Sequence, residues 1–228
     1  MPNLSIQPSL LAADIGRLAD ECRRAADAGA DGLHLDIMDA HFVRNLSFGP
    51  EVVKLARRTV SLPLSVHLMM TEPQRYVEAF CAAGATVLQI HQEARCDVAA
   101  VLAAIRAQGA RAGLTLNPET PAAAAFPWLD AGQVDEVLCM SVHPGFGGQA
   151  FLPHVIEKAR VLRQRRPELD ISIDGGIGPD NAPACAAAGV NIFIAGTTLF
   201  RAPDMAAAVA AMRAGIREAA AGAARSGS

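Results

Sequence analysis

The sequence alternates eight times between a short run rich in Leu and β-branched residues and a longer segment in which apolar residues recur every three or four positions. Such runs have the length of buried strands, and the longer segments have the period of amphipathic helices. The C-terminal ends of successive runs lie 21 to 34 residues apart, which is the length of one strand plus one helix. The runs are Leu4–Leu10, Gly32–Ile37, Leu64–Leu68, Thr86–Ile90, Ala112–Leu116, Glu136–Met140, Ile171–Asp174 and Ile192–Ala195.

The segments between the runs carry the start and stop signals of helices. A small-residue signature closes four of them, Ala-Gly-Ala at 28–30 and 83–85, Gln-Gly-Ala at 108–110 and Ala-Gly-Val at 188–190. In each, the Gly can adopt the left-handed conformation that ends a helix. Prolines suited to the first helical turn stand at Pro50, Pro73, Pro153, Pro179 and Pro203.

This alternation predicts an α/β protein with a parallel sheet, and eight strand–helix units close naturally into a single (β/α)8 TIM barrel. An open, doubly wound sheet is the alternative on the pattern alone. The length of 228 residues fits one barrel domain, which we place at residues 1–221. Residues 222–228 are small and polar, and we expect them to form a disordered tail.

Composition excludes several classes of partner. The net charge is −3 and no block of Lys and Arg occurs, which argues against nucleic acid. No apolar run reaches the roughly 18 residues of a membrane helix. The five cysteines form no C-x-x-C pair and the N-terminus shows no signal peptide, so we expect a reduced, cytoplasmic setting. A symmetric homo-oligomer is compatible with the helices, but no patch identifies an interface.

Polar side chains stand at the predicted C-terminal ends of three runs, where barrel enzymes place their working residues. His34 and Asp36 are two apart on one strand and therefore share a face, His67 lies on the next strand, and Asp174 ends the seventh. Two imidazoles and two carboxylates suit Zn²⁺, with Mn²⁺, Fe²⁺ or Co²⁺ as alternatives. Taken singly, a strand-end His is more often a hydrogen-bonded core residue, so spacing alone does not settle the metal.

Glycine-rich stretches follow the last three runs. Clustered glycines let backbone N–H groups approach an anion, and the loops after strands seven and eight form the usual phosphate site of this barrel. Glycine also serves simply to turn the chain, so each stretch is weak evidence by itself. The proposed cradle comprises Gly145, Phe146, Gly147 and Gly148, then Gly175 and Gly176, and finally Gly196 and Thr197.

Eight segments together resemble the ribulose-phosphate 3-epimerase family. The resemblance runs in order from about Ile6 to about Phe200, and its His-x-Asp-x-Met-Asp and Pro-Gly-Phe-Gly-Gly-Gln pieces are highly specific in combination. The segments are Pro-Ser-Leu-Leu at 8–11, His-Leu-Asp-Ile-Met-Asp at 34–39, His-Phe-Val at 41–43, Val-His-Leu-Met at 66–69, Leu-Asn-Pro at 116–118, Met-Ser-Val at 140–142, Pro-Gly-Phe-Gly-Gly-Gln at 144–149 and Asp-Gly-Gly-Ile at 174–177.

The resemblance implies an isomerase that interconverts D-ribulose 5-phosphate and D-xylulose 5-phosphate, a reaction of the pentose phosphate pathway and the Calvin cycle. It implies one divalent metal ion per chain, held by His34, Asp36, His67 and Asp174. Asp36 and Asp174 would also exchange protons at C3 from opposite faces, through an enediolate. The family's substrate-contacting Ser and its site-lining methionines correspond to Ser9, Met38, Met69 and Met140, and we expect His67 to border the substrate as well.

The chain departs from the usual family pattern at a few positions. Ala40 and Arg44 stand where Gly and Pro are common, His143 where Asn is common, and Thr197-Thr198 where Ser-Ala is common. None of these is a proposed metal ligand. They bear on the identity of the substrate, and they leave D-allulose-6-phosphate 3-epimerase as an alternative.

Two further alternatives fit the barrel. A sugar-phosphate decarboxylase would carry Asp-x-Lys-x-x-Asp at the second strand end, where this chain has His34 and Asp36 ahead of Asp39. Without that Lys, no obvious donor remains to protonate the carbanion. A non-catalytic sugar-phosphate-binding barrel would keep the phosphate cradle but lose one of the two histidines or two aspartates, and all four are present.

Overall fold

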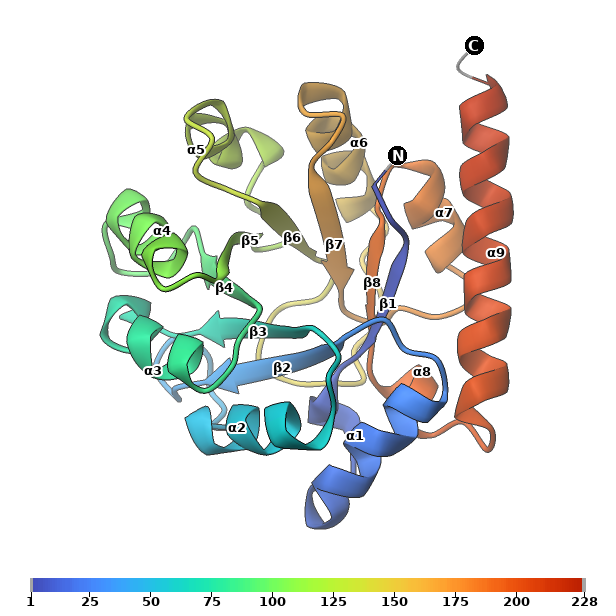
Figure 1. Ribbon diagram of the computed structural model, residues 1–228. Coiled ribbons are helices and arrows are strands. Elements are labelled where there is room, and N and C mark those ends of the chain that lie inside the picture. Colours follow the sequence, from blue (N-terminus) through green and yellow to red (C-terminus); the bar gives the residue numbers. More distant parts are fainter. Residues whose placement is uncertain (1, 227–228) are drawn as a thin grey trace.

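The computed structural model describes residues 2–226, and these form a barrel of eight parallel strands surrounded by helices (Figure 1). The (β/α)8 fold predicted from the sequence is confirmed, and the open doubly wound sheet is not what the chain forms. The strands are β1 Ser5–Pro8, β2 Leu33–Met38, β3 Leu64–Met69, β4 Val87–His91, β5 Arg111–Leu116, β6 Glu136–Met140, β7 Asp170–Asp174 and β8 Ile192–Ala195.

The helices lie outside the strands and follow them in alternation. The glycines of the four helix-end signatures all have positive φ, as expected for residues that end a helix in the left-handed region. The helices are α1 Leu18–Asp27, α2 Pro50–Thr59, α3 Val77–Ala82, α4 Val98–Ala107, α5 Phe126–Asp130, α6 Val155–Arg165, α7 Ala182–Ala187, α8 Thr197–Phe200 and α9 Met205–Ser226.

The barrel closes between β1 and β2. Each of the other adjacent strand pairs is joined by a regular parallel ladder, whereas here a parallel bridge joins Ser9 to His34. The side chain of Asp31 supports this junction by accepting from the backbone N–H of Ile6 at 2.8 Å. Arg213 of α9 donates to the same carboxylate at 2.8 Å. The last helix therefore helps to hold the first two strands together.

The structure differs from the sequence expectation at both ends of the chain. β1 stops at Pro8 because a short 3-10 helix, η1 (Leu10–Ala12), follows it. Ser9 caps this helix, and its side chain accepts a hydrogen bond from the backbone N–H of Leu11. α9 continues through residue 222 to Ser226, because Ala and Arg are strong helix formers and one Gly costs only about 1 kcal/mol. Residues 227 and 228 of the expected tail lie outside the described residues. Among the described helices, none is long and apolar enough to cross a membrane.

The strands separate an apolar layer from a polar barrel interior. Leu33, Leu35 and Ile37 of β2 belong to the core between sheet and helices, so His34 and Asp36 face inward. Branched apolar residues usually fill such interiors, but this one holds many buried polar groups. They include His34, Asp36, Ser65, His67, Gln89, His91, Thr115, Glu136 and Ser172.

Candidate metal centre and active site

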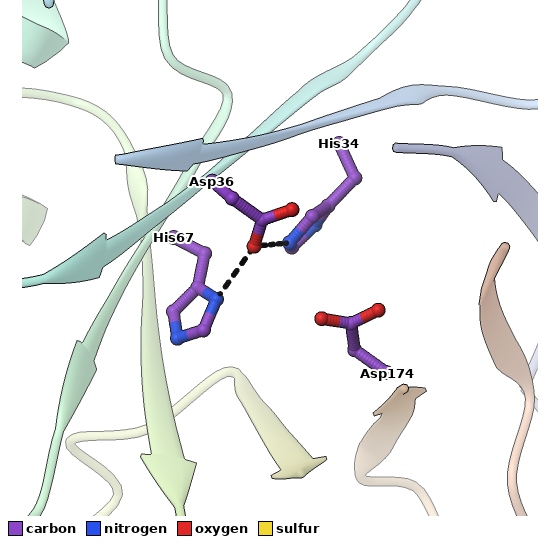
Figure 2. A group of neighbouring side chains, drawn as sticks. All are labelled: His34, Asp36, His67 and Asp174. Carbon is purple, nitrogen blue, oxygen red and sulfur yellow. Dashed lines mark hydrogen bonds and ion pairs between the residues drawn. The ribbon is translucent and has the colours of Figure 1, made fainter. Parts of the chain in front are cut away.

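Strands β2, β3 and β7 place four potential metal ligands at the carboxyl end of the barrel (Figure 2). Asp36 and His67 are partners in the β2–β3 register, and His34 points to the same face of β2 as Asp36. Asp174 ends β7 and faces this group from the other side. The sequence therefore predicted correctly which side chains meet.

The geometry of these four side chains fits a divalent cation. One ligand atom from each of His34, Asp36, His67 and Asp174 can be chosen so that all lie within 4.8 Å of one another. A single oxygen of Asp36 lies 3.2 Å from Nε2 of His34 and 3.1 Å from Nδ1 of His67. Two imidazole nitrogens and two carboxylates are the donor set that Zn²⁺ and related ions prefer.

The two aspartates have opposite electrostatic surroundings. Burial acts to raise the pKa of Asp36, but the charge and hydrogen bond of His34 lead the effects that outweigh it and hold that pKa well below its usual range. Burial and the nearby charge of Asp36 together raise the pKa of Asp174. Asp36 is therefore the more readily ionised group, and Asp174 the more readily protonated one.

A cavity of about 290 Å³ opens above the aspartates. Asp36 and Asp174 line its floor, and Ser9 donates to the second oxygen of Asp36 at 2.7 Å. His34 and His67 are fully buried and lie outside the lining. The sequence predicted that His67 borders the substrate, but its buried ring does not reach the cavity. The other expected substrate-side residues that line the cavity are Met38, Met69, Met140, Gly145, Phe146, Gly147, Gly148, Gly175, Gly176, Gly196 and Thr197.

The glycine-rich loops line the cavity, and at Gly176 their backbones approach each other closely. Gly176 has φ +65°, and a Cβ there would lie 2.8 Å from the backbone nitrogen of Phe151. Gln149 holds the loop after β6 by donating to the carbonyls of His143 and Phe146 at 2.7 and 2.9 Å. Gly is needed at 176 because both backbone conformation and space exclude a side chain.

The departures from the family pattern lie in the segments that follow β2, β6 and β8. Ala40 follows β2 with φ +60°, a conformation that favours glycine, which is the residue common in the family there. At the surface, Nε2 of His143 lies 3.5 Å from Oε1 of Glu119. Thr197 and Thr198 line the cavity, and Thr198 donates to the carbonyl of Ile177 at 2.8 Å. None of these residues displaces a candidate ligand.

Sequence reasoning missed two residues behind the site, His91 and Glu93. Nε2 of His91 lies 2.8 Å from Nε2 of His67, and Nδ1 of His91 lies 3.2 Å from Glu93. Burial lowers the pKa of His67 to about 4 and also lowers that of His91, so both rings favour the neutral form. A His-x-Glu pair at the end of β4 was the available signal, because it follows the same strand-end pattern as His34 and Asp36.

Comparison with known proteins identifies the family. The model of the ribulose-phosphate 3 epimerase family matches residues 5–200. The chain belongs to this family. It is 43% identical over 210 residues to "Ribulose-phosphate 3-epimerase, cytoplasmic isoform" of Oryza sativa subsp. japonica, covering 91% of this chain and 92% of the relative. It is 46% identical to the ribulose-phosphate 3-epimerase of Mycobacterium bovis, with 91% of each chain covered.

Solved structures of lower identity share the fold. KGPDC from Streptococcus mutans superposes with a TM-score of 0.72 at 17% identity and covers 95% of this chain and 98% of its own. The 3-keto-L-gulonate-6-phosphate decarboxylase of Vibrio cholerae gives 0.71 at 19% identity, covering 95% and 98%. At these identities the comparison establishes the barrel fold alone.

Proposed function

We propose that this chain is a ribulose-phosphate 3-epimerase that interconverts D-ribulose 5-phosphate and D-xylulose 5-phosphate by two-base proton transfer. The observation that carries the proposal is geometric: two aspartates, Asp36 from β2 and Asp174 from β7, face each other at one cavity that both of them line. Inversion of a carbon needs two such groups, because a single base would return the proton to the face that it left. The family membership supports the same reaction.

The site also fits a divalent metal ion, held by His34, Asp36, His67 and Asp174, with Zn²⁺ favoured by the donor set. When bound, such an ion supplies positive charge close to the substrate oxygens on which negative charge develops after proton removal. The same four residues would keep it at the floor of the cavity, next to the proton-transfer groups.

The remaining residues orient the substrate and exclude water. Ser9 holds one oxygen of Asp36, which fixes the carboxylate toward the cavity. Met38, Met69 and Met140 cover the floor with apolar surface and offer no proton that competes with the aspartates. The glycine-rich loops present backbone N–H groups, which suits recognition of the phosphate without Lys or Arg.

Replacement of Asp174 by Asn tests the two-base assignment. The variant keeps the shape of the side chain but cannot exchange a proton on its face, so epimerisation should fall by at least about 10²-fold. In D₂O, Asp36 should still exchange the C3 hydrogen of one epimer with retention, while the other epimer gains almost no deuterium. Asp180→Asn, an exposed change outside the cavity, is the matched control.

Metal content must be measured in both variants, because loss of metal would abolish both reactions. Rates should be measured on ribulose 5-phosphate and on allulose 6-phosphate, which separates the pentulose from the hexulose substrate. Equal exchange of both epimers by metal-loaded Asp174→Asn, or epimerisation at the wild-type rate, would refute the assignment.

A further inference from the structure

Strand β4 ends at His91, which contacts the candidate metal ligand His67 on one side and Glu93 on the other. The two rings meet through their Nε2 atoms at 2.8 Å, and Nδ1 of His91 lies 3.2 Å from one carboxylate oxygen of Glu93. His67 and His91 are both 0% exposed. Protein groups, and not bulk water, therefore determine which ring nitrogens carry protons.

Glu93 is itself held in place. Its other carboxylate oxygen accepts the backbone N–H of Asn117 at 3.0 Å and the hydroxyl of Thr120. Lys158 of α6 fixes this loop by donating to the carbonyl of Asn117 at 2.6 Å. Burial acts to raise the pKa of Glu93, but the hydrogen bonds from His91, Thr120 and Asn117 outweigh burial and lower that pKa to about 2. The carboxylate is therefore ionised and acts only as an acceptor.

An ionised Glu93 determines which ring nitrogens of His91 and His67 carry protons. Nδ1 of His91 must donate to Glu93, because a carboxylate has no proton to give. In a neutral ring, Nε2 of His91 is then an acceptor, so the proton between the two rings belongs to Nε2 of His67. Nδ1 of His67 is left with its lone pair, 3.1 Å from an oxygen of Asp36.

This order places two acceptors, Nδ1 of His67 and the carboxylate of Asp36, against each other, which is the arrangement that a cation between them requires. The reverse order would place an unprotonated Nδ1 of His91 against the ionised Glu93, where no cation site exists among the described residues. The geometry therefore couples Glu93 to the metal site through two rings.

We propose that Glu93 and His91 are positioning residues that hold His67 in the tautomer that presents Nδ1 to the metal, and that metal affinity depends on them. The inference rests on the proposed metal site and adds two residues to its function. Supporting hydrogen bonds of this kind to a ligand histidine typically change metal affinity by about 10- to 100-fold.

The isosteric change Glu93→Gln should reverse the direction of the hydrogen bonds that run from His67 through His91 to residue 93. The carboxamide has one oxygen, and the fixed N–H of Asn117 together with Thr120 retains it. The amide NH₂ group then faces His91 and donates to Nδ1, so Nε2 of His91 takes the proton and donates to His67. Nε2 of His67 becomes the acceptor and Nδ1 carries a proton, which blocks it as a ligand.

We expect Glu93→Gln to bind Zn²⁺ about 10- to 100-fold more weakly than the wild type in competition with a chromogenic chelator. Glu119→Gln is the matched control, since Glu119 lies on the same loop as Thr120 but is exposed at the surface. It should bind Zn²⁺ like the wild type. Thermal unfolding of the metal-free proteins would show that each variant is folded.

Nitrogen-15 NMR of zinc-loaded wild type tests the proton order without a variant. We expect His91 to be protonated at Nδ1 and not at Nε2, and the proton on Nε2 of His67 to show a coupling across the N–H···N hydrogen bond. A proton on Nε2 of His91, or wild-type zinc affinity in Glu93→Gln, would overturn the inference. A wild type that binds no zinc would instead refute the metal site on which the inference rests.

Discussion

Asp36 and Asp174 are chemically identical, yet the residues around them shift their pKa values in opposite directions. His34 lies within hydrogen-bond distance of Asp36, and its charge favours the ionised form of that carboxylate. Asp174 is half-buried and faces that negative charge, which favours its protonated form. The difference in pKa between the two aspartates therefore arises from the side chains around them, and not from the aspartates themselves.

Glycine is required at 176 for reasons that do not apply at Gly147, which lies in the loop after β6. A methyl group at Gly176 would meet the backbone of Phe151 at 2.8 Å and of Gln149 at 2.9 Å, with φ at +65°. Gly176→Ala should lower the free energy of unfolding by about 1–3 kcal/mol and raise KM for the sugar phosphate. Gly147 has open space around it, so Gly147→Ala should leave stability unchanged or raise it by up to about 1 kcal/mol. Urea denaturation of both variants would check this, and equal losses would contradict it.

Single residues also show how far the sequence could predict the site. His34 and Asp36 could be assigned to one face because side chains alternate along a strand. His67 and Asp174 could be added because barrel enzymes place their working residues at strand ends. His91 and Glu93 could not be linked to His67 in this way. Their contact depends on the offset between β3 and β4, which the sequence does not specify. A histidine at a strand end also fits an ordinary core residue.

At the scale of elements, the C-terminal helix α9 stabilises the barrel through its first three turns. Its buried side chains, Met205, Val209, Met212 and Ile216, recur at helical spacing. The helix packs against α7 (Figure 1). The sequence predicted a tail from residue 222, because Gly and Ser in the last residues resemble a linker. Ala-rich helix propensity extends the helix further, although the buried face ends earlier.

The unequal burial along α9 leads to a prediction. Met212→Ala removes a side chain that is 2% exposed and should lower the free energy of unfolding by about 2–5 kcal/mol. Deletion of residues 223–228 leaves every one of the four buried side chains in place, so it should cost less than about 1 kcal/mol. Guanidinium denaturation of the two proteins would compare them. A deletion as costly as Met212→Ala would show that the end of the helix also supports the barrel.

At the scale of the whole molecule, the candidate metal ligands connect strands that are distant along the barrel wall. β2 and β3 are neighbours, but β7 is separated from β3 by β4, β5 and β6. A bound ion would therefore link the start and the end of the chain across the barrel. β1 and β2 are joined by a bridge and not by a full ladder, so this link would strengthen the barrel near its weakest junction.

Metal should consequently stabilise the folded protein by mass action. Zn²⁺ at about 100 times its Kd should raise the free energy of unfolding by about 2.7 kcal/mol, because the unfolded chain does not hold the four ligands together. Thermal unfolding over a series of free Zn²⁺ concentrations would measure the rise in Tm, and a chelator should reverse it. His67→Ala removes one ligand and should flatten the dependence on Zn²⁺, whereas Glu119→Gln should retain it. A Tm that is independent of Zn²⁺ in the wild type, or an equal rise in His67→Ala, would show that the four residues do not form the site.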